Sequence, residues 1–126
     1  MSKFIKENSN CKVIFNGDGS DEVCCGYVYN LNAPTANHLQ EESIRLINEL
    51  YLFDVLRSDR SISSNGLEAR TPFLDKSFVN LYVSIPPELK IFDKKDRIEK
   101  YLLRKAFESD NLLPPDVLWR HKCAFS

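Results

Sequence analysis

The clearest apolar run in the chain is Val13-Ile14-Phe15, which is continuous rather than alternating and ends at Asn16-Gly17. These residue types favour strands, and an unbroken apolar run is typical of a strand buried in a parallel sheet. A weaker second candidate strand is Lys90-Ile91-Phe92. Because a lone strand leaves both its edges unpaired, the sequence predicts that this strand has partners.

Most of the remaining chain shows helical periodicity. Leu39, Leu46, Leu50 and Phe53 fall on one face of a helix, with charged residues opposite, and this pattern predicts an amphipathic helix over 37–57. Asn37 followed by Gln40 has the form of a capping box. Further helices are expected, with proline pairs setting some of their ends, over 75–83, 96–108 and 114–119.

Composition and charge narrow the class of protein. The 126 residues are 43% hydrophobic and 28% charged, which predicts one globular domain rather than a disordered chain. A net charge of −1 argues against a nucleic-acid-binding surface. No apolar run approaches the roughly 18 residues of a membrane span. Residues 1–10 form a polar leader without the apolar stretch of a signal peptide, so we expect a cytoplasmic protein.

The four cysteines do not indicate a disulfide scaffold or a zinc site. Cys24 and Cys25 are adjacent, and neither they nor Cys11 and Cys123 show a Cys-x-x-Cys or Cys/His ligand spacing. Free thiols in a reducing compartment are therefore expected, and no metal site is predicted.

The segment 16–22 combines glycines and carboxylates where the predicted strand ends. In α/β sheets ligands bind at this end of a strand. Gly17 and Gly19 permit a tight bend and a close approach of a ligand to the backbone. The segment has no Gly-Lys-Ser/Thr of a P-loop, no third glycine of the dinucleotide fingerprint, and no EF-hand glycine.

The three carboxylates of this segment are Asp18, Asp21 and Glu22. Such a cluster would repel a bare phosphate and suits Mg²⁺, an ammonium group or a general base. A purely structural interpretation remains open, in which Ser20 caps a helix and Asp21 and Glu22 complement its dipole.

Two other segments carry candidate chemistry. In 66–75, Arg70 can form a structural ion pair with a nearby acid or grip a carboxylate or phosphate ligand. The basic residues of 119–122 can complement a helix end or reach phosphates. His38 and His121 lack partners at catalytic spacing and are expected at the surface or at helix ends.

Together, five ordered segments carry a resemblance to a known family. The segments are 12–22, 26–27, 66–76, 99–104 and 119–122. In their order and spacing they resemble the C-terminal synthetase domain of glutamine-hydrolysing asparagine synthetases. The resemblance covers 11–126 and implies an α/β fold, part of a doubly wound ATP-pyrophosphatase-type sheet. The chain itself is expected to be mostly helical with one clear strand.

The resemblance also implies a reaction, in which Mg-ATP adenylates the β-carboxylate of aspartate and ammonia or glutamine-derived nitrogen displaces AMP. It assigns Asp18 and Lys122 to catalysis, with Asp18 as the base for the incoming nitrogen. Substrate binding falls to Asp21, Glu22 and Arg70. Binding of nucleotide and pyrophosphate falls to Gly17, Gly19, Arg60 and Lys122.

The departures from the family pattern define further expectations. The family usually has Glu at the position of Asp18 and Lys at the position of Arg60. Because Asp is one methylene shorter than Glu, its carboxylate is withdrawn by ~1 Å, and such a displacement can lower the rate ~10²-fold. No segment matches the glutaminase half or the Ser-Gly-Gly-x-Asp-Ser loop that holds pyrophosphate. This chain alone is therefore expected to lack activity. Three interpretations stay open: part of an asparagine synthetase completed by another polypeptide, a non-catalytic remnant, and a related adenylating enzyme such as a β-lactam synthetase.

Overall fold

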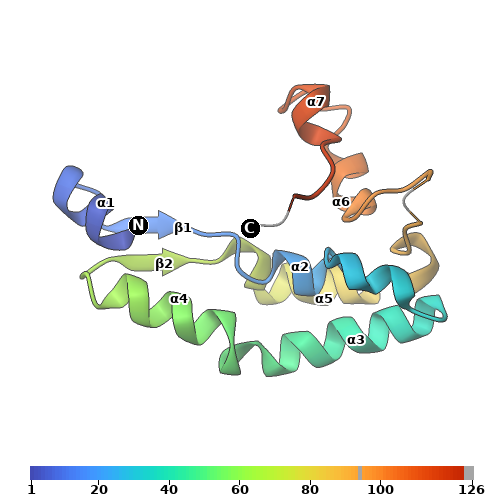
Figure 1. Cartoon of the computed structure of the whole chain (residues 1–126), viewed down its shortest axis with the longest axis horizontal. Helices are drawn as coiled ribbons and strands as arrows, with labels where there is room; N and C mark the ends of the chain where they lie inside the picture. Colours follow the sequence, from blue (N-terminus) through green and yellow to red (C-terminus); the bar gives the residue numbers. More distant parts are fainter. Residues whose placement is uncertain (94, 124–126) are drawn as a thin grey trace.

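The computed structural model describes residues 1–93 and 95–123, and within them a small parallel sheet lies toward one end of a mostly helical fold (Figure 1). Strand β1 (Val13–Phe15) pairs in parallel with β2 (Glu68–Arg70), with Val13 opposite Glu68 and Phe15 opposite Arg70. The helices are α1 (Ser2–Asn8), α2 (Ser20–Val23), α3 (Ala36–Glu49), α4 (Asp54–Ser63), α5 (Lys76–Ser84), α6 (Tyr101–Ala106) and α7 (Pro115–Leu118). Short 3₁₀ turns cover Val28–Asn32, Leu50–Leu52, Pro72–Leu74 and Pro87–Leu89.

The strand predicted over 13–15 is confirmed, but its partner is not the predicted one. The segment 90–92 forms no strand, because Lys90 turns inward and its Nζ donates to the carbonyl oxygen of Tyr82, 3.1 Å away, near the C-terminal end of α5. The actual partner, β2, is short and polar in sequence, so no hydrophobic pattern marks it.

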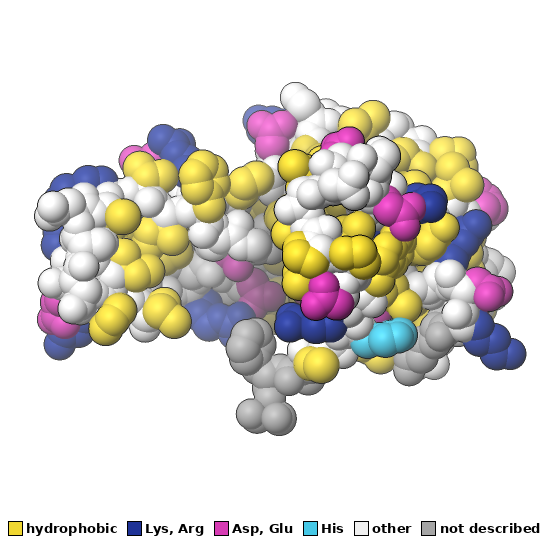
Figure 2. Space-filling model, turned by 90° about the horizontal axis from the view of Figure 1, so that it is seen from above, with side chains coloured by type: hydrophobic (Ala, Val, Ile, Leu, Met, Phe, Trp, Pro, Cys, Tyr) yellow, Lys and Arg dark blue, Asp and Glu magenta, His cyan; other side chains and the backbone are white. Residues whose placement is uncertain are grey.

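The expectation that β1 is buried is wrong for the described chain. Phe15 is 75% exposed and Val13 is 44% exposed. The sheet formed by the described residues has two strands, so one edge of β1 has no strand paired with it. Figure 2 shows hydrophobic side chains gathered at the surface around this end of the molecule, where α1 also exposes Phe4.

The long helix predicted over 37–57 is two helices. α3 begins after Thr35, whose Oγ1 accepts the backbone N–H of His38, so Thr35 and not Asn37 is the N-cap. α3 ends at Glu49, and α4 begins at Asp54 after an intervening 3₁₀ turn. The four successive apolar residues 50–53 cannot share one helical face, because neighbouring side chains are about 100° apart. In the structure Leu50 is buried, and the next three side chains point outward.

The other helix predictions hold to different extents. α5 and α7 lie within the predicted ranges or within one residue of them, and Asp75 caps α5 by accepting the N–H groups of Ser77 and Phe78. The helix predicted over 96–108 is only six residues long, because Asp93 holds the preceding backbone in a turn and Lys100 has φ +58°. Helix α1 lies in the segment that was predicted only as a polar leader.

The hydrophobic core lies between α2, α3 and α5. Its buried centre is formed by Val23, Cys24 and Tyr82, and Leu39 of α3 is also buried. The core therefore fixes α2, the helix that follows the glycine-rich bend, against the rest of the fold.

All four cysteines are free thiols, as predicted, and burial raises the pKa of Cys24 to about 12. Among the described residues, no helix combines the length and the apolar character needed to cross a membrane.

Candidate functional site

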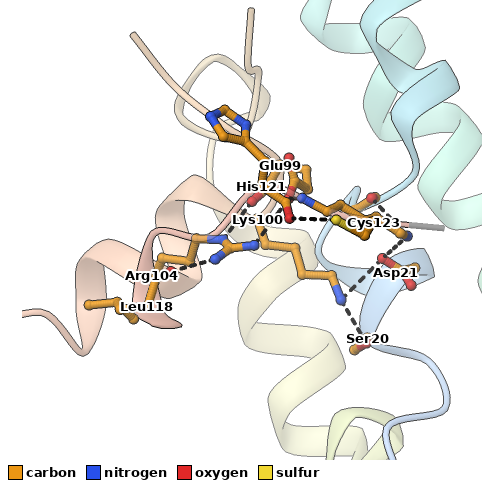
Figure 3. A network of polar contacts seen from close by, with 10 residues as sticks. Ser20, Asp21, Glu99, Lys100, Arg104, Leu118, His121 and Cys123 are labelled. Carbon is orange, nitrogen blue, oxygen red and sulfur yellow. Dashed lines mark hydrogen bonds and ion pairs between the residues drawn. The ribbon is translucent and has the colours of Figure 1, made fainter. Parts of the chain in front are cut away.

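The centre of the candidate site is Asp21, in the first turn of α2. Its Oδ1 lies 2.9 Å from the Nζ of Lys122 and 3.1 Å from the Nζ of Lys100. Lys100 also donates to the hydroxyl of Ser20 over 2.9 Å (Figure 3). The two lysines come from the far C-terminal part of the chain, Lys122 being 101 positions from Asp21. One carboxylate thus joins α2 to the segments around α6 and after α7.

Lys122 makes further contacts that hold its ammonium group in place. Its Nζ donates to the carbonyl oxygen of Gly26 over 3.2 Å and lies 5.0 Å from the centre of the Tyr27 ring. The second contact is a cation–π interaction. A Cβ atom at Gly26 would overlap with Asp21 Oδ1 and Lys100 Cε, so this position must be glycine for the ion pairs to form as they do.

The two lysines determine the charge state of Asp21. Burial by itself raises the pKa of this carboxyl, but the hydrogen bond from Lys122 and the positive charge of Lys100 outweigh burial. The pKa of Asp21 therefore lies below its ordinary value, and the group is a carboxylate at neutral pH.

We expect Asp21→Asn to lower the free energy of unfolding at pH 7 by about 1 kcal/mol, because two ammonium groups lose their charged partner. Since the folded-state pKa of Asp21 is lowered, its contribution is present above pH ~4 and is lost as the pH falls through the folded-state pKa. Urea unfolding measured between pH 2 and pH 7 should show a flatter pH dependence for the variant. The exposed Asp59 provides the control Asp59→Asn, and equal pH profiles for Asp21→Asn and the parent would contradict the assignment.

The bend that presents Asp21 depends on Gly19. Gly19 has φ +84° and is the N-cap of α2, so the expectation that Ser20 caps the helix is wrong. Ser20 is instead the first residue of α2, and its hydroxyl accepts the hydrogen bond from Lys100. Gly17 faces open space, with no atom within 4 Å of where its Cβ would be.

Asp18 lies on the same bend but in a different group of contacts. Its Oδ2 accepts a hydrogen bond of 3.0 Å from Asn16 Nδ2, and its backbone N–H donates to Asn16 Oδ1 over 3.1 Å. Among the described residues, Asp18 makes no ion pair. It is half-buried beside the open face of Gly17, which leaves its second oxygen for a ligand.

Glu22 is only 4% exposed and faces a separate cavity of about 440 Å³. The Tyr27 hydroxyl donates a hydrogen bond to Glu22 Oε1, and burial together with this carboxylate raises the pKa of Tyr27. Arg45 and Arg57 line the cavity's outer part. Tyr27 links the two halves of the site, since its hydroxyl binds Glu22 and its ring lies under Lys122.

The two predicted arginines are also not brought to Asp21. Arg70 pairs with Glu68 at 2.5 Å on exposed β2, as the structural interpretation of Arg70 predicted. Its backbone carbonyl accepts the N–H of Asn16, so β2 still supports the bend. Arg60 is exposed in the last turn of α4, and no side-chain contact of the described residues joins it to the Asp21 group.

Three residues of the site, Tyr27, Glu99 and Lys100, have no role among those expected from the sequence. Lys100 reaches Ser20 across 80 positions of sequence, so no local spacing could reveal it. The only available signal was the presence of 26–27 and 99–104 among the segments that carried the family resemblance.

Basic side chains gather around a hollow beside Asp21. A hollow of about 200 Å³ is lined by five basic side chains together with Glu99 and Val117, the basic ones being Lys100, Arg104, Arg120, His121 and Lys122. The three carboxylates of the bend do not converge, and the described part of the chain has no group of three or more His, Cys, Asp or Glu placed to hold a metal. Mg²⁺ commonly binds one or two carboxylates together with substrate phosphates, a mode that does not need three converging carboxylates.

Comparison with known proteins confirms the resemblance. The family model described as Asparagine synthase matches residues 31–126. Over all 126 residues, the chain is 55% identical to the asparagine synthetase [glutamine-hydrolyzing] of Rattus norvegicus, 54% to that of Gallus gallus and 53% to that of Homo sapiens. The match covers 100% of this chain and 22% of each relative. A family match over most of the chain and this identity over its whole length show that the chain belongs to the asparagine synthase family.

Proposed function

We propose that this chain forms the aspartate-facing wall of a site that makes asparagine from aspartate, ATP and ammonia or glutamine-derived nitrogen. The observation that carries the proposal is the Asp21 carboxylate held between the ammonium groups of Lys100 and Lys122. This arrangement places negative and positive charge side by side. The negative charge suits the ammonium group of an amino acid, and the positive charges suit the phosphates of a nucleotide bound next to it.

Each side of the site has a proposed role. Asp21 supplies a carboxylate for the α-ammonium group of aspartate. A substrate-binding role for Glu22, which is buried and faces a separate cavity, would require the two carboxylates to come together. Lys122 and Lys100 supply positive charge for the phosphates, where negative charge develops as pyrophosphate leaves. Mg-ATP, when bound, supplies the adenylyl group that activates the β-carboxylate. Gly17 leaves room for a ligand at the bend, whereas the space beside Gly19 is filled by the Leu74 side chain, so a nucleotide-binding role for Gly19 is confined to shaping the bend.

Asp18 is the proposed base for the incoming nitrogen. Ammonium has no lone pair, so a carboxylate must take a proton before nitrogen attacks the activated carbonyl. The half-buried position of Asp18 on the bend, three residues before Asp21, supports this role. Roles for Arg70 and Arg60 would require rearrangement of the exposed side chains seen here.

The chain spans 22% of the length of the relatives it matches, so the complete reaction is a proposal for an assembly larger than the described site. We propose that the ATP-phosphate loop comes from a further segment or a complementary polypeptide, and that the assembly acts in the cytoplasm. The similarity to asparagine synthetases supports amidation of aspartate over β-lactam formation.

A chimeric enzyme tests the proposal. In it, this chain replaces the matched segment of the Rattus norvegicus relative, and aspartate-dependent pyrophosphate release is measured with ammonia supplied directly. We expect turnover by the chimera and none by the 126-residue chain alone. A folded chimera without turnover would support a non-catalytic remnant instead, and turnover by the chain alone would overturn the proposed need for further parts.

We expect Asp18→Ala to lower ammonia-dependent asparagine formation in the chimera by about 10²-fold, because the nitrogen loses its proton acceptor. Pyrophosphate release in a single turnover should be affected less, since adenylation precedes nitrogen attack. Asp18→Glu should preserve or raise the rate. Asp59→Ala, at an exposed position of α4, is the matched control. Unchanged asparagine formation by Asp18→Ala would exclude Asp18 as the base.

A further inference from the structure

Glu99 is a buried carboxylate that the proposed reaction does not use. It is only 7% exposed and directly precedes Lys100. A buried carboxylate is costly unless it is paired and hydrogen-bonded. The contacts of Glu99 therefore indicate what it is retained for.

Those contacts are with the segment that carries Lys122. Glu99 Oε1 accepts the backbone N–H of Lys122 over 2.8 Å and lies 3.1 Å from Nη2 of Arg104. The residues around Lys122 follow α7 without helix or strand, so their position depends on such contacts. Glu99 is bound to the peptide group of the residue whose side chain reaches Asp21.

Arg104 holds the other end of the same segment. Its Nε donates to the Glu99 carbonyl oxygen over 2.9 Å, and its Nη1 donates to the carbonyl oxygen of Leu118, at the end of α7 (Figure 3). Glu99 and Arg104 together therefore attach residues 118–122 at both ends. The arrangement also fixes the peptide of Lys100, the second partner of Asp21.

We propose that Glu99 is a positioning residue, which sets the reach of Lys122 to Asp21 through the backbone amide of Lys122. The catalytic consequence rests on the proposed function, but the positioning is a property of this chain. A simple structural ion pair of Glu99 with Arg104 would stabilise the fold without changing the environment of Asp21.

The direct test measures the pKa of Asp21. The ¹³C NMR signal of its carboxyl carbon is recorded during a pH titration of the full chain. In Glu99→Ala, Lys122 is released while the burial of Asp21 remains, so the pKa of Asp21 should move upward from its lowered value. In Glu99→Gln, a carbonyl oxygen still accepts the Lys122 N–H, so the pKa of Asp21 should stay near that of the parent. Glu7→Ala removes an exposed glutamate of α1 and is the matched control.

The outcomes separate positioning from stability. If Glu99→Ala is folded and leaves the pKa of Asp21 unchanged, the proposal is overturned. If Glu99→Ala does not fold, Glu99→Asp decides, because it keeps the charge but withdraws the carboxylate by ~1 Å; an unchanged pKa of Asp21 would again overturn the proposal.

The chimeric enzyme supplies the second readout. Glu99→Ala should lower the rate of pyrophosphate release by up to about 10²-fold, the loss that a ~1 Å misplacement of a functional group can cause, and Glu99→Gln should restore most of it. An inactive parent chimera would count against the proposed function and leave the NMR result intact. An upward shift of the pKa of Asp21 without loss of rate in an active chimera would overturn the catalytic consequence alone.

Discussion

Replacing Lys122 by alanine should lower pyrophosphate release by the chimeric enzyme about 10²- to 10³-fold, the loss expected when one charged donor to a developing anion is removed. The ammonium group is held in place by Asp21 Oδ1 at 2.9 Å, the Gly26 carbonyl oxygen at 3.2 Å and the face of Tyr27. A positive charge held in this way needs no reorganisation during the reaction. Initial rates of pyrophosphate release with saturating ammonia measure the effect.

The matched control for this change is Lys105→Ala. Lys105 is exposed on α6 and pairs with Glu108, so its loss removes the same chemical group away from Asp21. The control should retain the parent rate, because exposed ion pairs contribute little. If Lys122→Ala changes only the melting temperature and leaves the rate of the chimera intact, Lys122 is a structural lysine and the proposed phosphate role is wrong.

The largest effect on stability is expected from Gly19→Ala, which should lower the free energy of unfolding by about 2 to 4 kcal/mol. Two causes add. Gly19 has φ +84°, which a residue with a Cβ adopts only with strain. The new Cβ would also overlap the Leu74 side chain, with Cγ of Leu74 only 2.6 Å away, so the whole isopropyl group must move. Urea unfolding at pH 7 measures the difference.

Gly17→Ala provides the comparison two residues earlier. Gly17 lacks a positive φ, and no atom lies within 4 Å of its Cβ position, so this change should alter the free energy of unfolding by less than about 0.5 kcal/mol. A loss from Gly19→Ala as small as that expected for Gly17→Ala would show that the bend tolerates a side chain at Gly19 and that the close packing against Leu74 does not constrain it.

Local elements were the part of the fold that could be predicted. The run Val13–Phe15 is apolar and consists of β-branched and aromatic residues, which predicts β1. Asp75 and the proline pairs indicate ends of α5 and α7. Strand β2 could not be predicted, because Glu68–Arg70 becomes a strand only through backbone pairing with β1, more than fifty positions away. The break between α3 and α4 was missed because periodicity alone does not show which apolar residues find a partner.

The candidate site was predicted as a cluster and proved to be three separate groups of contacts. Asp21 and Glu22 are adjacent on α2, and successive helical side chains diverge by about 100°, so Asp21 meets the lysines while Glu22 enters its own cavity. Asp18 lies before the helix and turns to Asn16. Arg70 was predicted either in an ion pair or on a ligand, and the described structure shows the ion pair with Glu68.

The sequence by itself determined the strand, the glycine bend after it, the carboxylates on the bend and the family, because each is encoded in neighbouring residues or in the order of short segments. Only the tertiary structure decided which cations those carboxylates meet. Lys100 and Lys122 reach Asp21 because α6 and the chain after α7 return to α2, held there by Glu99 and Arg104. Contacts between residues 80 to 101 positions apart depend on the packed fold, and no local pattern specifies them.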